Sequence, residues 1–195
     1  MLATMLERVA AHAERQCGAV SLGQLTNAGL TERHVRAWIR AERILPTVAR
    51  AVFRMPGAAV TWRQHLWVAV LAGPPGTVVS HASAVALRGL FPPPAVPHVT
   101  VPRGSSGRFA GAVVHHASVL SADRCRVERL PCTGAARAIV DCAALLDQEA
   151  LDDLVDARSA GTSPATAASW PPGTAPVGSG AAASSARPSN RSRGT

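Results

Sequence analysis

The chain has 195 residues, of which 47% are hydrophobic. Its formal net charge is +8, and it contains 20 arginines and no lysine. This composition supplies the core of one average domain or of two small ones. The longest apolar run, residues 66–72, is far shorter than a membrane span, and acidic Glu7 and Glu14 argue against a signal peptide. We therefore expect a cytoplasmic protein without a membrane segment.

The charge is unevenly distributed along the chain. Residues 1–57 carry eight arginines and four acidic residues, and residues 58–122 carry four arginines and no acidic residue. Residues 123–160 reverse the sign, with eight acidic residues and five arginines. A basic body of this kind attracts polyanions, and nucleic acid is the commonest of these. A positive charge that merely keeps the protein soluble is consistent with the same composition. Sequence motifs are therefore needed to distinguish nucleic-acid binding from this alternative.

The first forty residues carry the signals of three helices. Apolar residues at helical spacing predict an amphipathic helix over residues 2–15. Ser21 is a good N-cap for a second short helix that Gly29 ends, and Thr31 caps a third. The predicted buried stripe of the third helix is Val35, Trp38 and Ile39. The connection between the second and third helices is only a few residues long, as a helix-turn-helix requires.

An extended ribbon is predicted to follow these helices. Pro46 prevents a helical continuation, and the alternation over residues 48–55 predicts one extended segment that a Pro56-Gly57 turn closes. The residues expected on one face of the ribbon are Val48, Arg50, Val52 and Arg54. Three helices and a β-ribbon are the element order of a winged helix, so we predict a winged helix-turn-helix DNA-binding domain at residues 1–57.

The next hundred residues predict a small α+β domain, residues 58–160. We expect a helix from Thr61, a second helix over residues 78–89, and a last helical stretch capped by Thr133. Strands are expected at residues 96–101 and 112–116, separated by a turn at residues 104–107. The core stripe of the last helical stretch is predicted to be Ile139, Val140, Leu145, Leu146, Leu151 and Leu154. The predicted fold class is therefore α+β.

The last 35 residues have a biased composition. In residues 161–195, 29 side chains are Ala, Ser, Pro, Gly or Thr. Such a segment buries too little apolar surface to offset the entropy lost on ordering, so we predict a disordered tail.

The polar side of the third helix is the predicted DNA-reading surface. In a helix-turn-helix the N-terminal part of the recognition helix enters the major groove. Arg33 and Arg36 are the candidates for base reading because arginine bonds guanine O6 and N7 in a bidentate fork, and later arginines suit phosphates. The complete set of predicted DNA-binding residues is Arg33, His34, Arg36, Ala37, Arg40, Arg43, Arg50 and Arg54. The alternatives are a solvated ribbon face for the last two and a winged helix that docks a protein.

Three segments, in this order, resemble one known family. These are "ILPTVARAVFRMPG", "VVSHASAVALRGL" and "LPCTGAARAIVDCAALL". Over about residues 5–158 the chain resembles the AbiEi-type antitoxins of type IV toxin–antitoxin systems, in their actinobacterial form. The resemblance implies a winged-helix domain that represses its own operon. It also implies a C-terminal domain that opposes a nucleotidyltransferase-like toxin without a stable complex.

The chain departs from the family pattern at three places. Ala51 stands where family members usually have a glycine before the wing's second strand, and Ala138 stands where the family has a threonine. Longer relatives continue into an endonuclease-like domain, whereas this chain has the biased tail after Arg158. A truncation or a frameshift would explain that tail. The alternative function is therefore a partner-binding or accessory remnant of a longer protein.

No residue pattern predicts an enzyme, a cofactor or a metal ion. Ser80 and His81 adjacent on a helix would point about 100° apart, and His115 and His116 on a strand would face opposite ways. Arg137 and Asp141 are predicted to form an intrahelical ion pair. The cysteines lack metal-ligand spacing and are expected to be reduced thiols: Cys17, Cys125, Cys132 and Cys142. The acidic residues after position 146 are predicted to be a solvated helix face, and the oligomeric state is left open.

Overall fold

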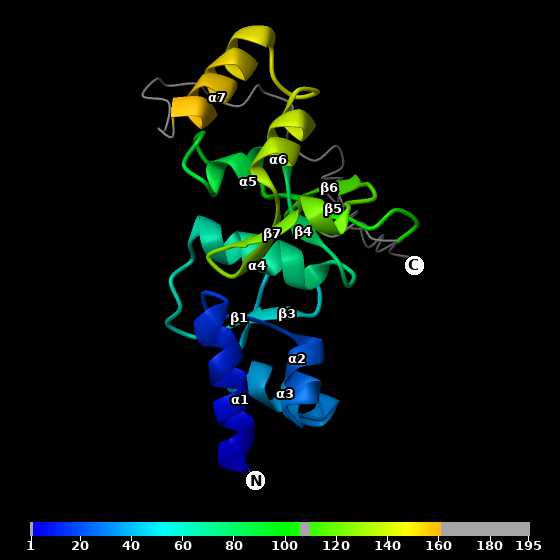
Figure 1. The fold of residues 1–195 in the computed structure, drawn as a ribbon. Coiled ribbons are helices and arrows are strands. Elements are labelled where there is room, and N and C mark those ends of the chain that lie inside the picture. Colours follow the sequence, from blue (N-terminus) through cyan, green and yellow to red (C-terminus); the bar gives the residue numbers. More distant parts are fainter. Residues whose placement is uncertain (1, 106–109, 161–195) are drawn as a thin grey trace, which may run out of the picture.

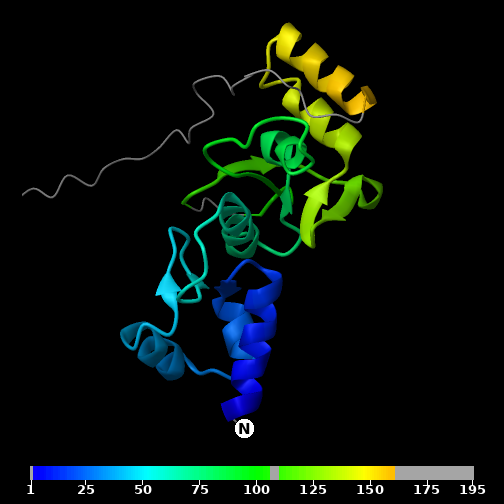
Figure 2. The ribbon, with the colours of Figure 1, turned by 90° about the vertical axis from the view of Figure 1, so that its left-hand side faces the viewer.

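The computed structural model describes residues 2–105 and 110–160, and these form a mixed α+β fold with two sheets (Figure 1). The α+β class is therefore as predicted. The predicted disordered tail and part of the predicted turn at residues 104–107 lie outside the described residues. The first three helices lie at one end of the molecule and the helix at residues 148–160 lies at the other (Figures 1 and 2). None of the helices in the described segments is both long and apolar enough to cross a membrane.

The first three helices begin where the sequence predicts. They are α1 (Leu2–Arg15), α2 (Leu22–Asn27) and α3 (Glu32–Arg40). Ser21 caps α2 and Thr31 caps α3, and each cap is a reciprocal capping box that satisfies two backbone N–H groups. Four residues connect α2 to α3. The apolar sides of these helices meet in one buried cluster, which includes Val9, Leu25, Val35 and Trp38.

The predicted ribbon is a tight hairpin instead of one extended segment. Its strands are β2 (Leu45–Pro46) and β3 (Val52–Arg54), and β1 (Ala19–Ser21), which the sequence does not predict, pairs antiparallel with the other side of β3. The chain reverses between the strands, so Val48 is exposed whereas Val52 is buried. The expectation that these two valines share a face is wrong. The Thr47 hydroxyl donates to the Val52 carbonyl at 2.8 Å and stabilises the reversal.

Helix α4 (Trp62–Ala72) lies between the two sheets (Figure 1). It begins after Thr61, as predicted, and its Gln64 side chain donates to the Cys17 carbonyl at 2.8 Å. Val52 from the first sheet and Leu66 from α4 belong to one buried cluster that continues into the second half. The apolar core therefore runs across the turn at residues 56–57.

The second sheet has five strands in the order β6-β5-β4-β8-β7. The strands are β4 (Val78–Val79), β5 (His98–Val101), β6 (Val113–His116), β7 (Arg124–Val127) and β8 (Leu130–Thr133). The pairs β4–β8 and β5–β6 are parallel, and β4–β5 and β7–β8 are antiparallel. The predicted strands at residues 96–101 and 112–116 correspond to β5 and β6. A short 3-10 helix, Ser121–Asp123, precedes β7.

Two of the helix starts predicted in this half are wrong. The helix expected over residues 78–89 begins as central strand β4, and only α5 (His81–Ala86) is helical. Short apolar runs do not distinguish a buried strand from a buried helix, and here β-branched Val78 and Val79 form the strand. Thr133 is not a helix cap either. It is the fully buried last residue of β8, and Gly134 occupies the cap position of the next helix.

The last helical stretch is divided into α6 (Ala135–Cys142) and α7 (Gln148–Ala160). Leu154 is fully buried, as predicted. Val140, which is predicted to be a core residue, is 69% exposed, because α6 buries Ala138 and Cys142 instead.

Candidate functional site

The polar side of α3 gathers three of the predicted DNA-binding arginines. Val35 and Trp38 are buried in the N-terminal cluster and fix the rotation of the helix. Arg33, Arg36 and Arg40 follow one another at helical spacing on the opposite side, and all three are exposed. Ala37 and, just beyond the helix, Arg43 are exposed as well. This side of α3 is therefore a basic surface on a rigidly packed helix.

His34 has a local role at the start of α3. The His34 Nδ1 atom accepts a hydrogen bond from the Thr31 backbone N–H at 3.2 Å, and the backbone N–H of His34 donates to the Thr31 hydroxyl at 3.3 Å. The imidazole therefore helps to fix the end of the helix that is predicted to enter the groove.

Arg36 has an acidic neighbour on the same helix. One of its guanidinium nitrogens lies 3.6 Å from Glu32 Oε2, and both side chains are exposed. Exposed pairs of this kind stabilise a helix by only about 0.3–0.5 kcal/mol. A phosphate or a guanine edge can displace Glu32 at small cost, so Arg36 remains available to a ligand.

The two arginines of the hairpin do not act together. Arg50 is exposed in the turn, and Figure 2 shows α3 and this hairpin on the same side of the N-terminal half, away from α1. Arg54 is half-buried on the central strand β3 and lines a cavity of about 510 Å³ between the hairpin and the second half. The structure thus separates Arg54 from Arg50, which the ribbon prediction had placed on one face.

A second polar constellation, which we call the histidine cluster, joins His81, His98 and His115. The rings of His81 and His115 are stacked with centroids 3.5 Å apart, and the rings of His98 and His115 lie 5.3 Å apart. His98 Nδ1 is 3.2 Å from His115 Nε2. The three rings come from the start of α5, from β5 and from β6.

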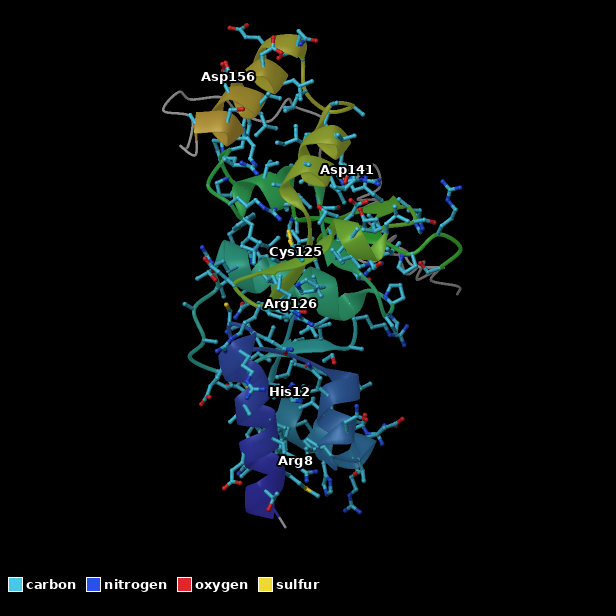
Figure 3. All side chains as sticks on the ribbon, in the orientation of Figure 1. Arg8, His12, Cys125, Arg126, Asp141 and Asp156 are labelled. Atoms are coloured by element: carbon cyan, nitrogen blue, oxygen red, sulfur yellow. The ribbon has the colours of Figure 1, made fainter. Side chains whose placement is uncertain are left out.

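Hydroxyl and charged groups surround the histidine cluster. Ser80 Oγ lies 2.9 Å from His81 Nδ1 and accepts a hydrogen bond from the Thr100 hydroxyl at 2.8 Å. Asp141, labelled in Figure 3, has one oxygen 4.0 Å from His81 Nδ1 and the other 2.7 Å from Arg137 Nε. The predicted Arg137–Asp141 pair is therefore present, and it connects α6 to the cluster.

The expectation that Ser80 and His81 cannot face one another is wrong. It assumes that both residues are helical, whereas Ser80 is extended, with φ −146° and ψ 179°, and precedes the helix. His81 has φ 48°, in the left-handed region that L-residues rarely adopt. This backbone turn brings the two side chains together.

Burial keeps the histidine cluster neutral at pH 7. Burial, together with the neighbouring His115, His98 and Arg137, lowers the pKa of His81 to about 3. Burial and His115 lower the pKa of His98 to about 4. Burial also lowers the pKa of His115, and the Asp141 carboxylate opposes that shift.

The geometry of the histidine cluster suits a structural network better than a catalytic relay. A Ser-His-Asp relay uses one imidazole nitrogen for the serine and the other for the carboxylate. Here Ser80 and Asp141 approach the same nitrogen of His81, and Ser80 is fully buried. Within residues 2–105 and 110–160, no group of three ligating side chains has the arrangement of a metal site.

The four cysteines are free thiols, and two of them lie beside Arg88. The Arg88 guanidinium is 3.2 Å from Cys125 Sγ and 3.4 Å from Cys132 Sγ, and it donates to the Thr133 carbonyl (Cys125 is labelled in Figure 3). Burial raises the pKa of Cys132 to about 11 and that of Cys142 to about 12. These two thiols are therefore protonated and unreactive at neutral pH.

The sequence analysis did not single out His98. A signal for it is present, since His98 and His115 interrupt otherwise apolar strands, where a buried histidine requires a polar partner. That signal does not reveal the partner, because the strands meet only in the folded sheet.

Comparisons with known proteins identify no family. No family model matches the chain, and no curated protein matches it. Among solved structures, the chain is similar to the RV2827C protein from Mycobacterium tuberculosis, with 16% sequence identity and a TM-score of 0.45. The similarity covers 78% of this chain and 71% of that one. At this identity and TM-score the likeness carries no conclusion about function.

Proposed function

We propose that the protein is a DNA-binding transcriptional regulator in which residues 1–57 act as a winged helix-turn-helix. The observation that carries this proposal is the exposed row of Arg33, Arg36 and Arg40 on α3, opposite the buried Val35 and Trp38. A helix that is held by its apolar side and presents arginines on the other matches the chemistry of a major-groove reader.

The surroundings of α3 support the same proposal. The four-residue connection from α2 and the capping box at Thr31 fix the start of α3, which is the end that a helix-turn-helix inserts into the groove. The hairpin lies on the same side of the N-terminal half as α3 (Figure 2), and its turn carries the exposed Arg50, which would suit the phosphate backbone or the minor groove.

A narrower proposal follows from the resemblance to AbiEi-type antitoxins. Under it, the protein represses its own operon and opposes a nucleotidyltransferase-like toxin without forming a stable complex with it. No enzymatic activity of the protein is required for either role.

The acidic face of α7 favours a second candidate, a partner-binding function. Asp152, Asp153 and Asp156 are exposed, and α7 buries only Leu154 and Ala157 (Asp156 is labelled in Figure 3). This face would suit a basic partner chain, and a pull-down with the neighbouring gene product tests it. Recovery of a stoichiometric complex would favour this candidate over antagonism without contact.

Binding of the full chain to the upstream region of its own gene tests the DNA-binding proposal. A labelled upstream fragment and an unrelated fragment of equal length are titrated at several salt concentrations. We expect a preference for the upstream fragment that persists near physiological salt. Equal binding to both fragments that disappears as salt rises would identify a merely basic protein and overturn the proposal.

A further inference from the structure

The cavity beside Arg54 has the size and the walls of a small-molecule site. Its volume is about 510 Å³, within the range of ligand pockets, roughly 300–1,000 Å³. The hairpin supplies one wall, α4 supplies the second, and residues 95–97 with Gly111 supply the third. Most of the lining is apolar, and the lining valines are Val48, Val60, Val68 and Val96.

Arg54 is the charged group built into this wall. It is half-buried on β3, where its backbone pairs with Ala19 on one side and with Leu45 on the other. The chain has no acidic residue between Glu42 and Asp123. In the described part of the chain no hydrogen bond or ion pair holds the Arg54 guanidinium. An anionic group entering the cavity therefore meets the Arg54 guanidinium without having to displace a carboxylate.

The rim of the cavity is unusually apolar for a surface. Val48 is 68% exposed and Val60 is 61% exposed, and both line the cavity. An apolar ligand that covers this rim is stabilised by about 25 cal/mol for each Å² of apolar surface removed from water. His65, the other titratable residue of the lining, is exposed.

Gly111 permits the close approach that encloses the cavity. Its φ is +82°, and a Cβ atom there would lie 2.5 Å from Cγ2 of Val48. The tip of the hairpin therefore packs directly against the second half, and whatever fills the cavity contacts the hairpin.

We propose that this cavity binds a small amphipathic carboxylate, whose apolar body lies against the valines and whose carboxylate pairs with Arg54. The body is about the size of a naphthalene ring system, which the volume accommodates. Arginine and carboxylate form charge-assisted, bidentate hydrogen bonds, which favour an anion over a neutral analogue of the same shape.

Occupancy of the cavity changes the affinity for DNA, since the hairpin is both a wall of the site and the carrier of Arg50. Coupling between two sites is reciprocal, so DNA also changes the affinity for the carboxylate. This coupling rests on the proposed DNA-binding function, whereas ligand binding itself does not.

Calorimetric titration of the full chain with 1-naphthoate, and with the neutral 1-naphthalenemethanol, tests the binding site. We expect 1-naphthoate to bind with a Kd below about 1 mM, and the alcohol to bind at least about tenfold more weakly. Arg54→Met keeps the apolar stem of the side chain and should weaken 1-naphthoate binding at least about tenfold, whereas the exposed Arg103→Met should leave it unchanged. Val48→Trp, at an exposed position, should fill the cavity and abolish binding.

Three results would overturn the site. They are no binding of 1-naphthoate at 1 mM or above, equal binding of acid and alcohol, or undiminished binding to Arg54→Met. The coupling is measured separately, as the ratio of upstream-DNA affinities with and without saturating 1-naphthoate. We expect a ratio of at least about threefold in the original chain and no change in Arg54→Met. Ligand binding without any DNA binding would reject the proposed function alone, and binding of both without a changed ratio would reject the coupling.

Discussion

The two halves of the molecule use their polar side chains in opposite ways. The half before residue 58 exposes all of its arginines except the half-buried Arg54, and among its described residues only Gln16 is a buried polar side chain. In the second half, the described residues include seven buried polar side chains: Gln64, Thr77, Ser80, Ser83, His98, Thr100 and Thr133. Substitutions on the polar surface of the first half should therefore change binding and leave stability intact. Substitutions in the buried polar network of the second half should change stability and its pH dependence.

The largest effect is expected on α3. Replacing both Arg33 and Arg36 by alanine should lower the affinity for the upstream fragment at least about thirtyfold, because each bidentate arginine–guanine contact contributes about 1–3 kcal/mol. The melting temperature should fall by no more than about 1–2 °C, since both side chains are exposed and only the weak Arg36–Glu32 pair is lost. Fluorescence anisotropy with labelled DNA measures the affinity.

The matched control for this variant lies on α1. Arg8 and Arg15 are also exposed, and replacing both removes the same charge from a helix outside the predicted reading surface (Arg8 is labelled in Figure 3). A similar loss of affinity in the two double variants would mean that only total charge matters. Unchanged affinity after the α3 substitutions would exclude Arg33 and Arg36 as base readers.

The largest effect on stability, as opposed to DNA affinity, tests whether the two halves unfold together. Leu66 is fully buried in the cluster that also contains Val52 of the first sheet and Val79 of the second. Leu66→Ala should lower the free energy of unfolding by about 3 kcal/mol, within the usual range for buried leucines. Because the cluster is shared, fluorescence and circular dichroism should report one coincident urea transition.

Leu6→Ala is the control, because Leu6 is 42% exposed, and its effect should stay within about 0.5 kcal/mol. Two separate transitions in Leu66→Ala would show that the halves are independent domains. The difference between the halves would then extend to their stabilities.

Local sequence signals predicted the first half better than the second. Ser21 and Thr31 each form a capping box with a residue three positions later, so nearby side chains alone define the starts of α2 and α3. The basic side of α3 could be predicted for the same reason, because Val35 and Trp38 indicate which side is buried. Strand β1 escaped prediction because it is three residues long and its partner β3 is about thirty residues away.

The second half depends on pairings that the local sequence does not encode. The β7–β8 hairpin turns through Glu128 and Arg129, both with positive φ, in place of the Asn-Gly or Asp-Gly that usually marks such a turn. Strand β4 is only two residues long and is held by neighbours on both sides. His98 and His115 become partners only when β5 and β6 pair in parallel. The histidine cluster was therefore beyond a residue-by-residue prediction.

The histidine cluster predicts acid sensitivity in the second half. The pKa of His98 is about 4 in the folded protein and rises to about 6.5 on unfolding, so the unfolded chain binds more protons between these pH values. Stability is therefore complete above pH 6.5 and is lost as the pH falls. At pH 5 the loss from His98 alone should be about 2 kcal/mol.

Urea unfolding at pH 7 and pH 5 measures this loss. Asparagine in the His98→Asn variant keeps a polar group near His115 but does not titrate. The free energy of unfolding of this variant should therefore fall by about 2 kcal/mol less between pH 7 and pH 5 than that of the unsubstituted chain. His65→Asn, at an exposed position, should behave like the unsubstituted chain. An equal loss in all three proteins would place the acid sensitivity outside the cluster.

The smallest effect concerns the hairpin turn, at Ala51. Ala51 has φ 62°, a conformation that costs an L-residue about 1–2 kcal/mol, whereas glycine adopts it freely. Replacing Ala51 by glycine removes this cost, but the greater conformational freedom of glycine in the unfolded chain offsets part of the resulting stabilisation. We therefore expect Ala51→Gly to stabilise the protein by about 0.5 kcal/mol and to raise its melting temperature by about 1–2 °C.

Ala49→Gly is the control on the other side of the same turn. Ala49 is buried and its φ is not positive, so glycine there should lower the melting temperature. A rise in melting temperature for Ala51→Gly and a fall for Ala49→Gly would show that the backbone conformation, and not the loss of a methyl group, determines the effect. Changes in melting temperature of the same sign in both variants would mean that the turn has another conformation in solution. The proposed position of Arg50 beside α3 would then need revision, because Arg50 lies between the two alanines.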